Sequence, residues 1–161
     1  MKSWNNNSEA SAMTAQEAFS RLSALCAKGE HCRQEMVEKM GRWGLGDDEQ
    51  AEVLQRLADG RYVDDARYAR AFVNDKVRYS KWGRRKIEQA LWMKHIDEAT
   101  VQEALDDISD EEYVEVLRPL VEQKKRTTRA ANDYELRMKV VRFALGRGFT
   151  MEVIDKCLDE E

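Results

Sequence analysis

The segment from Lys81 to Lys86 reads Lys-Trp-Gly-Arg-Arg-Lys and places four cations within six residues. The apolar periodicity predicts that this segment starts a helix over residues 82–94. The first turn of a helix presents unpaired backbone N–H groups and the positive end of the helix dipole, so it already attracts anions. The segment therefore predicts binding of phosphate or carboxylate groups. For Trp82 and Trp92, packing within the protein is favoured over stacking on nucleic-acid bases.

A second cluster of cations comprises Lys124, Lys125, Arg126 and Arg129. It follows a helix predicted to start at Ser109, and we expect it to form a solvated loop. Contacts between such cations and the phosphates of a nucleic acid give affinity with a steep salt dependence, but no base specificity. Both clusters are therefore candidate binding sites for an anionic polymer.

Candidates for metal or acid–base chemistry are few. Cys26, His31 and Cys32 supply three possible zinc ligands, but no Cys-x-x-Cys pair or fourth ligand follows at zinc-finger spacing. His95 falls in a turn between two predicted helices, where a local cap or a surface position is the expected role. No metal site is predicted from these residues.

Adjacent carboxylates occur at Asp64–Asp65 and Asp106–Asp107. Neighbouring side chains on a helix point about 100° apart, so neither pair converges on a substrate, and both are expected to act as caps and dipole partners. The glycine pairs in 44–46 and 146–148 lack the third glycine and the preceding strand of a dinucleotide loop. We expect no enzyme and no cofactor.

The elements that carry these residues are predicted to be helical throughout, because eight glycines and one proline are too few for the turns of a many-stranded sheet. Thr14 and Glu17 have the spacing of a capping box. Pro119 predicts either a later start or a kink near Arg118 in the seventh helix. The nine predicted helices cover residues 14–28, 32–43, 48–59, 64–79, 82–94, from 97, from 109, 133–147 and 150–160.

An internal repeat organises these helices. Lys86–Ile87, Leu91 and Lys94–Ile96 align with Lys139–Val140, Ala144 and Arg147–Phe149 when 53 is added to each residue number. A weaker third copy starts near Met36 and requires about three inserted residues at 46–49. Such short units must share burial with their neighbours, which predicts an elongated, curved arrangement. The predicted organisation is a flexible tail (1–13) and three three-helix modules (14–60, 61–108 and 109–161).

The net charge of −4 hides a segregation of charge along the chain. Residues 61–92 hold nine basic and four acidic side chains, and residues 118–149 hold nine and three. Local potentials of this kind attract phosphate or an acidic protein face even when the whole chain is acidic. Three cysteines predict free thiols in a reducing compartment, and no signal peptide or membrane span is apparent, so a cytoplasmic protein is expected.

The string from Gly60 to Val73 resembles the G-Y-L-D-D-x-R-F-A-x-x-F-V block of the bacterial regulatory family RecX. Lys81–Gly83 is similar to that family's K-G segment, Arg85–Ile87 to its R-I pair, and Arg147–Phe149 to its C-terminal R-G-F turn. The resemblance covers residues 14–159. This sequence departs from the family's pattern at His95, where glycine is usual.

The resemblance implies a non-enzymatic modulator of RecA, the recombinase that forms filaments on single-stranded DNA. Members are three tandem three-helix modules that lie along the filament groove and mostly inhibit its recombinase, ATPase and coprotease activities. The implied partners are RecA, its filament and, weakly, single- and double-stranded DNA, with the chain itself a monomer. We hypothesise that binding is carried by Arg67, Arg70, Lys81, Arg84, Arg85, Lys86, Lys124, Lys125, Arg126 and Arg129.

Three alternatives remain open at this stage. The first is a free-standing DNA-binding protein of helix-turn-helix repeats that acts without RecA, which predicts tight, sequence-selective binding to bare DNA. The second is a scaffold for acidic partner helices, which predicts no effect of DNA. The third is an enzyme dependent on zinc at Cys26, His31 and Cys32.

Overall fold

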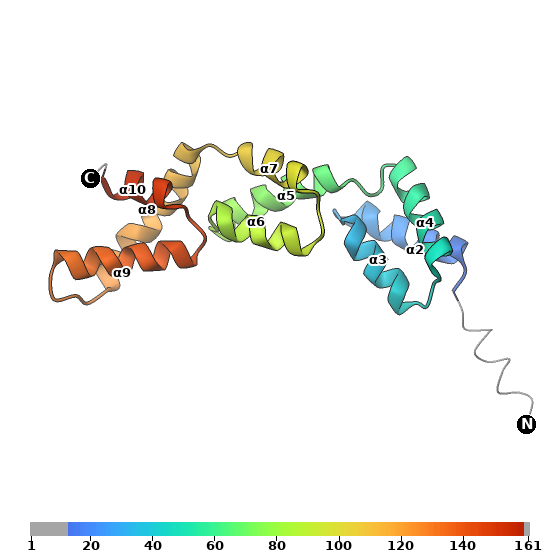
Figure 1. Cartoon of the computed structure of the whole chain (residues 1–161), viewed down its shortest axis with the longest axis horizontal. Helices are drawn as coiled ribbons and strands as arrows, with labels where there is room; N and C mark the ends of the chain where they lie inside the picture. Colours follow the sequence, from blue (N-terminus) through green and yellow to red (C-terminus); the bar gives the residue numbers. More distant parts are fainter. Residues whose placement is uncertain (1–12, 160–161) are drawn as a thin grey trace, which may run out of the picture. The chain divides into compact units, whose positions relative to one another are not determined.

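The computed structural model describes residues 13–159, and every regular element in that range is an α-helix (Figure 1). The predicted all-α class is confirmed for these residues. The predicted tail falls, except for Met13, outside them. No helix in this range has the length and apolar character needed to cross a membrane. The helices are α2 (Ala15–Lys28), α3 (Arg33–Arg42), α4 (Asp47–Asp59), α5 (Asp65–Arg78), α6 (Arg84–Met93), α7 (Glu98–Asp106), α8 (Asp110–Thr127), α9 (Asp133–Gly146) and α10 (Met151–Asp159).

The chain divides into two compact units, Met1–Tyr68 and Ala69–Glu161, and the boundary falls inside α5. In the first unit α2 and α3 both pack on α4. Their contact is formed by fully buried side chains at helical spacing, which include Leu22, Met36 and Leu57. Burial of this apolar stripe stabilises the three helices, because helices of 10 to 14 residues are marginal alone.

The second unit contains two groups of packed helices. The α6 and α7 helices form an antiparallel pair, and α8 packs with α9 and α10 (Figure 1). Ile87 and Leu91 are fully buried on α6, and Leu117 and Phe149 are buried in the second group. The three-module boundaries remain a prediction.

The repeat is visible in the bounds of the helices. Adding 53 to the ends of α7 gives the ends of α10, and adding 53 to the end of α6 gives the end of α9. The turns between the paired helices share a residue with positive φ, namely Gly44 (80°), His95 (57°) and Gly148 (97°). In each case the next helix starts three residues later. The insertion predicted at 46–49 is therefore absent from the turn. Helix α4 is longer than α7 and α10, and its additional residues lie at its C-terminal end.

Helix α8 differs from its prediction in two respects. It starts directly after Ser109, whose hydroxyl accepts the Glu112 N–H at 3.2 Å, and it continues through the exposed Pro119, so the later start was wrong. The loop predicted for the second cationic cluster contains Arg129, but it was wrong for Lys124, Lys125 and Arg126, which form the last turn of α8. Cations are stabilised there by the negative end of the helix dipole.

The predicted roles of the carboxylate pairs are partly right. Asp64 accepts the backbone N–H of Arg67 at 3.0 Å and so caps its own helix. Asp65 accepts the N–H of Arg33 at 2.9 Å and caps α3 instead. Asp106 is no cap, because its carboxylate forms an ion pair with a distant arginine, described below.

Candidate nucleoprotein-binding surface

The segment that leads into α6 packs on the turn between α9 and α10. The backbone N–H of Gly83 donates to the carbonyl oxygen of Arg147, and that of Arg85 donates to the carbonyl oxygen of Gly148, both at 2.9 Å. A Cβ on Gly83 would overlap the backbone of Gly148 and Phe149, so glycine is required at this position. We call this contact between the two segments the joint.

The joint corrects one prediction about α6. The free N–H groups of its first turn were expected to attract an anion, but the Gly148 carbonyl oxygen already occupies the Arg85 N–H. The Gly148 Cα also lies against Lys86, where an added Cβ would overlap the Lys86 side chain. At the Arg85 N–H, a carbonyl oxygen of the protein itself therefore stands where an anion would bind.

The side chain of Arg147 clamps the joint. Its Nη2 donates to the carbonyl oxygen of Ser80 at 2.8 Å, and its Nε donates to that of Lys81 at 3.2 Å. Lys81 has a left-handed backbone, with φ of 57°. Hydrogen bonds from a charged donor contribute about 1.5–3 kcal/mol, enough to hold a single residue in this conformation.

Two aromatic rings beside the joint are contacted by cationic side chains. The Nζ atoms of Lys76 and Lys86 lie 4.7 and 4.5 Å from the centre of the Trp82 ring. Each such contact contributes roughly 0.5–1 kcal/mol at an exposed site. The Trp82 ring is thus contacted by two lysines of the protein itself, and its role in packing rather than base stacking stays a prediction.

The second ring is that of Phe143 on α9. Lys124 Nζ lies 5.1 Å and Arg147 Cζ 5.9 Å from its centre. Cations from α5, α6, α8 and the turn after α9 are thus held near the joint. We call this set the joint cluster, which comprises Lys76, Trp82, Lys86, Lys124, Phe143 and Arg147.

Two of the arginines hypothesised to bind are engaged within the protein. Arg84 forms an ion pair with Asp106 at 2.7 Å and donates to Gln102 at 3.0 Å. Arg67, in the first unit, pairs with Glu30 at 2.7 Å and also donates to the Tyr62 carbonyl oxygen. Their cationic groups contribute less to a partner's electrostatic field than isolated charges would.

The other hypothesised residues lie on the second unit. Lys86 and Lys124 belong to the joint cluster, and Lys125 is half-buried in the last turn of α8. The remaining side chains are exposed: Arg70, Lys81, Arg85, Arg126 and Arg129.

Three members of the joint cluster were not among the sequence candidates, namely Lys76, Phe143 and Arg147. Lys76 lies in α5 outside both cationic clusters of the sequence, and Arg147 appears there only as part of a motif. Arg147 lies 67 residues from Ser80, its hydrogen-bond partner. The alignment of Arg147 with Lys94 in the repeat was a signal that this position carries a cation, but its partner depends on tertiary packing.

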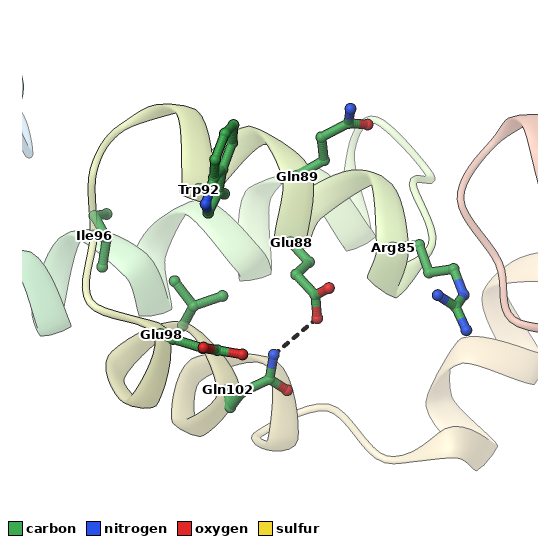
Figure 2. A pocket seen from close by; sticks show the side chains of 8 residues that line it. Arg85, Glu88, Gln89, Trp92, Ile96, Glu98 and Gln102 are labelled. Atoms are coloured by element: carbon green, nitrogen blue, oxygen red, sulfur yellow. Dashed lines mark hydrogen bonds between the residues drawn. The ribbon is translucent and has the colours of Figure 1, made fainter.

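A groove lies between α6 and α7, with a volume of about 560 Å³ (Figure 2). Trp92 lines it with its side chain 74% exposed, so the packing role predicted for Trp92 was wrong. Across the groove, Gln102 donates to Glu88 at 2.8 Å. The groove is lined by Arg85, Glu88, Gln89, Trp92, Ile96, Glu98, Val101 and Gln102.

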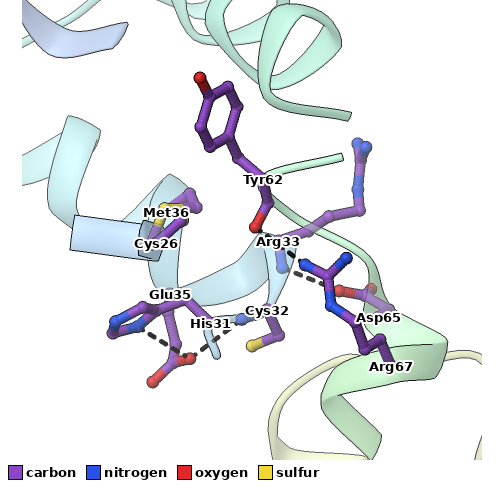
Figure 3. A network of polar contacts seen from close by, with 9 residues as sticks. All are labelled: Cys26, His31, Cys32, Arg33, Glu35, Met36, Tyr62, Asp65 and Arg67. Carbon is purple, nitrogen blue, oxygen red and sulfur yellow. Dashed lines mark hydrogen bonds and ion pairs between the residues drawn. The ribbon is translucent and has the colours of Figure 1, made fainter. Parts of the chain in front are cut away.

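The possible zinc ligands lie in a different network, in the first unit (Figure 3). The Glu35 carboxylate accepts the backbone N–H of Cys32 at 3.0 Å and lies 3.6 Å from His31 Nδ1. Cys26 Sγ lies 3.9 Å from the Met36 sulfur. Burial raises the pKa of the Cys32 thiol to about 11, which opposes the thiolate that zinc requires. Among the described residues, no group of three or more His, Cys, Asp or Glu side chains could hold a metal ion.

Comparison with known proteins decides the family. Residues 64–105 match the second three-helix domain of RecX, and residues 110–158 match the third. The chain is 31% identical over 135 residues to the regulatory protein RecX of Acinetobacter baylyi, covering 84% of this chain and 82% of that protein. The chain belongs to the RecX family. The RecX of Chromobacterium violaceum is 30% identical over 139 residues, 86% of each chain.

Solved RecX structures have the same fold. The crystal structure of RecX from Lactobacillus salivarius superposes with a TM-score of 0.85, covering 91% of this chain and 95% of that one, at 22% identity. A second RecX crystal structure gives a TM-score of 0.83 over 90% of this chain and 73% of the other. Two segments that resemble RecX motifs, Lys81–Gly83 and Arg147–Phe149, form the joint between the second and third RecX domains of this chain.

Proposed function

We propose that this chain regulates RecA by binding the RecA filament on single-stranded DNA, and that it mostly inhibits the filament's recombinase, ATPase and coprotease activities. Membership of the RecX family is the observation that carries this proposal. In this proposal the protein acts as a binding module and not as an enzyme.

The cations around the joint support a role in binding a nucleoprotein. Lys76, Lys86, Lys124 and Arg147 come from separate segments; cation–π contacts hold the first two on the Trp82 ring and the other two on the Phe143 ring. Such a group meets phosphates or acidic side chains without requiring a particular base. Many modest contacts along one polymer raise the overall affinity without any single strong site.

Because Arg67 and Arg84 are engaged in ion pairs, the proposed contacts to the filament are shifted toward the remaining cations. Lys81 and Lys86 are the ones to test first, since both are exposed and both lie beside the joint. The full proposed set is Arg70, Lys81, Arg85, Lys86, Lys124, Lys125, Arg126 and Arg129, together with Lys76 and Arg147.

The test is a charge reversal with a matched control. The double variant Lys81→Glu, Lys86→Glu should inhibit RecA-driven strand exchange at least about tenfold less than the wild type, because loss of charged contacts worth 1.4 kcal/mol or more changes affinity tenfold. The control Lys28→Glu, Arg42→Glu makes the same change in net charge on exposed residues of the first unit and should inhibit normally. Both variants should keep the helical circular dichroism spectrum. Full inhibition by the first variant would remove this surface from the proposal.

A second candidate is binding to bare DNA without RecA, which the joint cluster favours because it presents cations from four segments. Affinity for single- and double-stranded DNA, measured over a range of salt concentrations, separates the two. Weak, unselective binding that RecA strengthens supports the regulator, whereas tight, sequence-selective binding at physiological salt supports the alternative.

A further inference from the structure

The most exposed large side chain in the α6–α7 groove has an equivalent in the third domain. Trp92 is 74% exposed near the end of α6, and Leu145, 53 residues later, is 44% exposed near the end of α9. Single exposed apolar residues are ordinary on protein surfaces. The same exposed position in two related domains is not explained by chance exposure.

The neighbouring positions extend the comparison. Arg85 and Glu98, at the two ends of the groove, correspond to Met138 and Met151, which are also exposed. The equivalent face of α9 and α10 is thus more apolar than the groove of α6 and α7. We call these two surfaces the paired faces, defined by Arg85, Glu88, Trp92 and Glu98 on α6–α7 and by Met138, Val141, Leu145 and Met151 on α9–α10.

The charges on the paired faces disfavour nucleic acid. The α6–α7 face carries the Glu88 and Glu98 carboxylates against the single Arg85 guanidinium (Figure 2), so its charged side chains sum to −1, and the α9–α10 face presents methionine and leucine. A carboxylate repels phosphate, and an aliphatic side chain offers it no hydrogen bond. An exposed tryptophan is instead typical of the centre of a protein–protein contact, and exposed methionines are also enriched at such contacts.

We propose that the paired faces dock onto apolar side chains of two subunits in one protein polymer. The repeat favours this occupant, because an exposed apolar anchor at the same position of two related domains, Trp92 and Leu145, can meet two subunits of a partner that itself repeats. The inference rests on the proposed function, which supplies such a polymer in the RecA filament. It assigns the protein contact to the paired faces and leaves the joint cluster for the DNA phosphates or acidic groups.

The test compares truncations of the two anchors. We expect Trp92→Ala and Leu145→Ala each to weaken cosedimentation with RecA filaments on single-stranded DNA about tenfold, because truncating an anchor at an interface commonly costs at least that factor. The double variant should lose about a hundredfold if the faces bind independently. Binding to bare single-stranded DNA should stay unchanged in all three variants. All three should fold, because both side chains project into solvent.

Tyr79→Ala is the matched control, since Tyr79 is an exposed aromatic residue of the same unit that lies outside the paired faces. It should bind filaments like the wild type. Wild-type binding by the double variant, an equal loss for Tyr79→Ala, or a parallel loss of bare-DNA binding would each overturn the inference while leaving the proposed function intact. A wild-type chain that does not bind RecA filaments would overturn both.

Discussion

Gly83 lies so close to Phe149 that its hydrogen atoms occupy the only space between the two backbones. Phe149 is itself buried, with 1% of its surface exposed. The Gly83 N–H donates a hydrogen bond to the carbonyl oxygen of Arg147, two residues before Phe149. This hydrogen bond fixes the register of the contact. A glycine in a six-residue cationic motif is thus required by a segment more than 60 residues away.

Substitution of Gly83 tests the joint directly. We expect Gly83→Ala to lower the free energy of unfolding by about 1–3 kcal/mol, because the added methyl group forces two backbones apart. Thermal denaturation followed by circular dichroism measures the change. Gly146→Ala is the control, since an added Cβ there meets no atom within 4 Å and alanine favours the helix by about 0.5–1 kcal/mol. Equal melting temperatures for the two variants would contradict this account.

Arg147 should not be replaceable by lysine. Its guanidinium group reaches two carbonyl oxygens and the Phe143 ring at once, a geometry that a single ammonium group cannot reproduce. We expect Arg147→Ala and Arg147→Lys each to cost about 1.5–3 kcal/mol, the range for hydrogen bonds to a charged group. Hydrogen exchange of the Gly83 amide should accelerate in both variants. A lysine variant as stable as the wild type would show that charge alone suffices.

The strained turn before α7 predicts a stabilising substitution. His95 has φ of 57°, whereas the equivalent turns of the other two helix pairs use glycine. We expect His95→Gly to raise the free energy of unfolding by about 0.5–1 kcal/mol, since relief of the left-handed strain exceeds the entropy that glycine adds to the unfolded chain. Gly44→Ala is the opposite test, in a turn with open space, and should cost about 1–2 kcal/mol. Chemical denaturation of both variants measures whether each substitution raises or lowers the free energy of unfolding.

The buried thiol of Cys32 predicts a dependence of stability on pH. Burial raises its pKa from 9.0 to about 11 in the folded chain, so the unfolded chain loses the thiol proton first. The contribution of Cys32 to stability is present below pH 9 and is lost progressively between pH 9 and pH 11. Denaturation over this range should show a shallower decline for Cys32→Ala than for the wild type. Parallel curves for the two proteins would exclude this titration.

Much of the helical architecture follows from local sequence. Ser109 and Glu112 carry the side chains that start α8, and the spacing of Val114, Leu117 and Val121 gives its buried stripe. The proline signal was misleading, because Pro119 falls on the exposed face of the helix. The cationic composition of Lys124–Arg126 predicted a loop. These residues form the last turn of α8 instead, where their positive charges interact favourably with the helix dipole.

The candidate site was less predictable than the fold. Arg84 and Arg85 are adjacent in sequence, but only the fold shows that Arg84 pairs with Asp106. The pairing of Arg147 with Ser80 and Lys81 depends on how two helix groups pack, which no local pattern specifies. Trp92 carries the same local signal as a core residue but is exposed, because Ile87 and Leu91 are the fully buried side chains of α6.

The joint also bears on the thermodynamics of recognition. Because Gly83 and Arg85 are bonded to the turn at Arg147–Gly148, relative motion of the two adjacent helix groups is restricted at this point before any partner arrives. The conformational entropy of aligning them is lost when the chain folds, and not again on association. Loosening this one contact should therefore weaken binding even where every contacting side chain is retained.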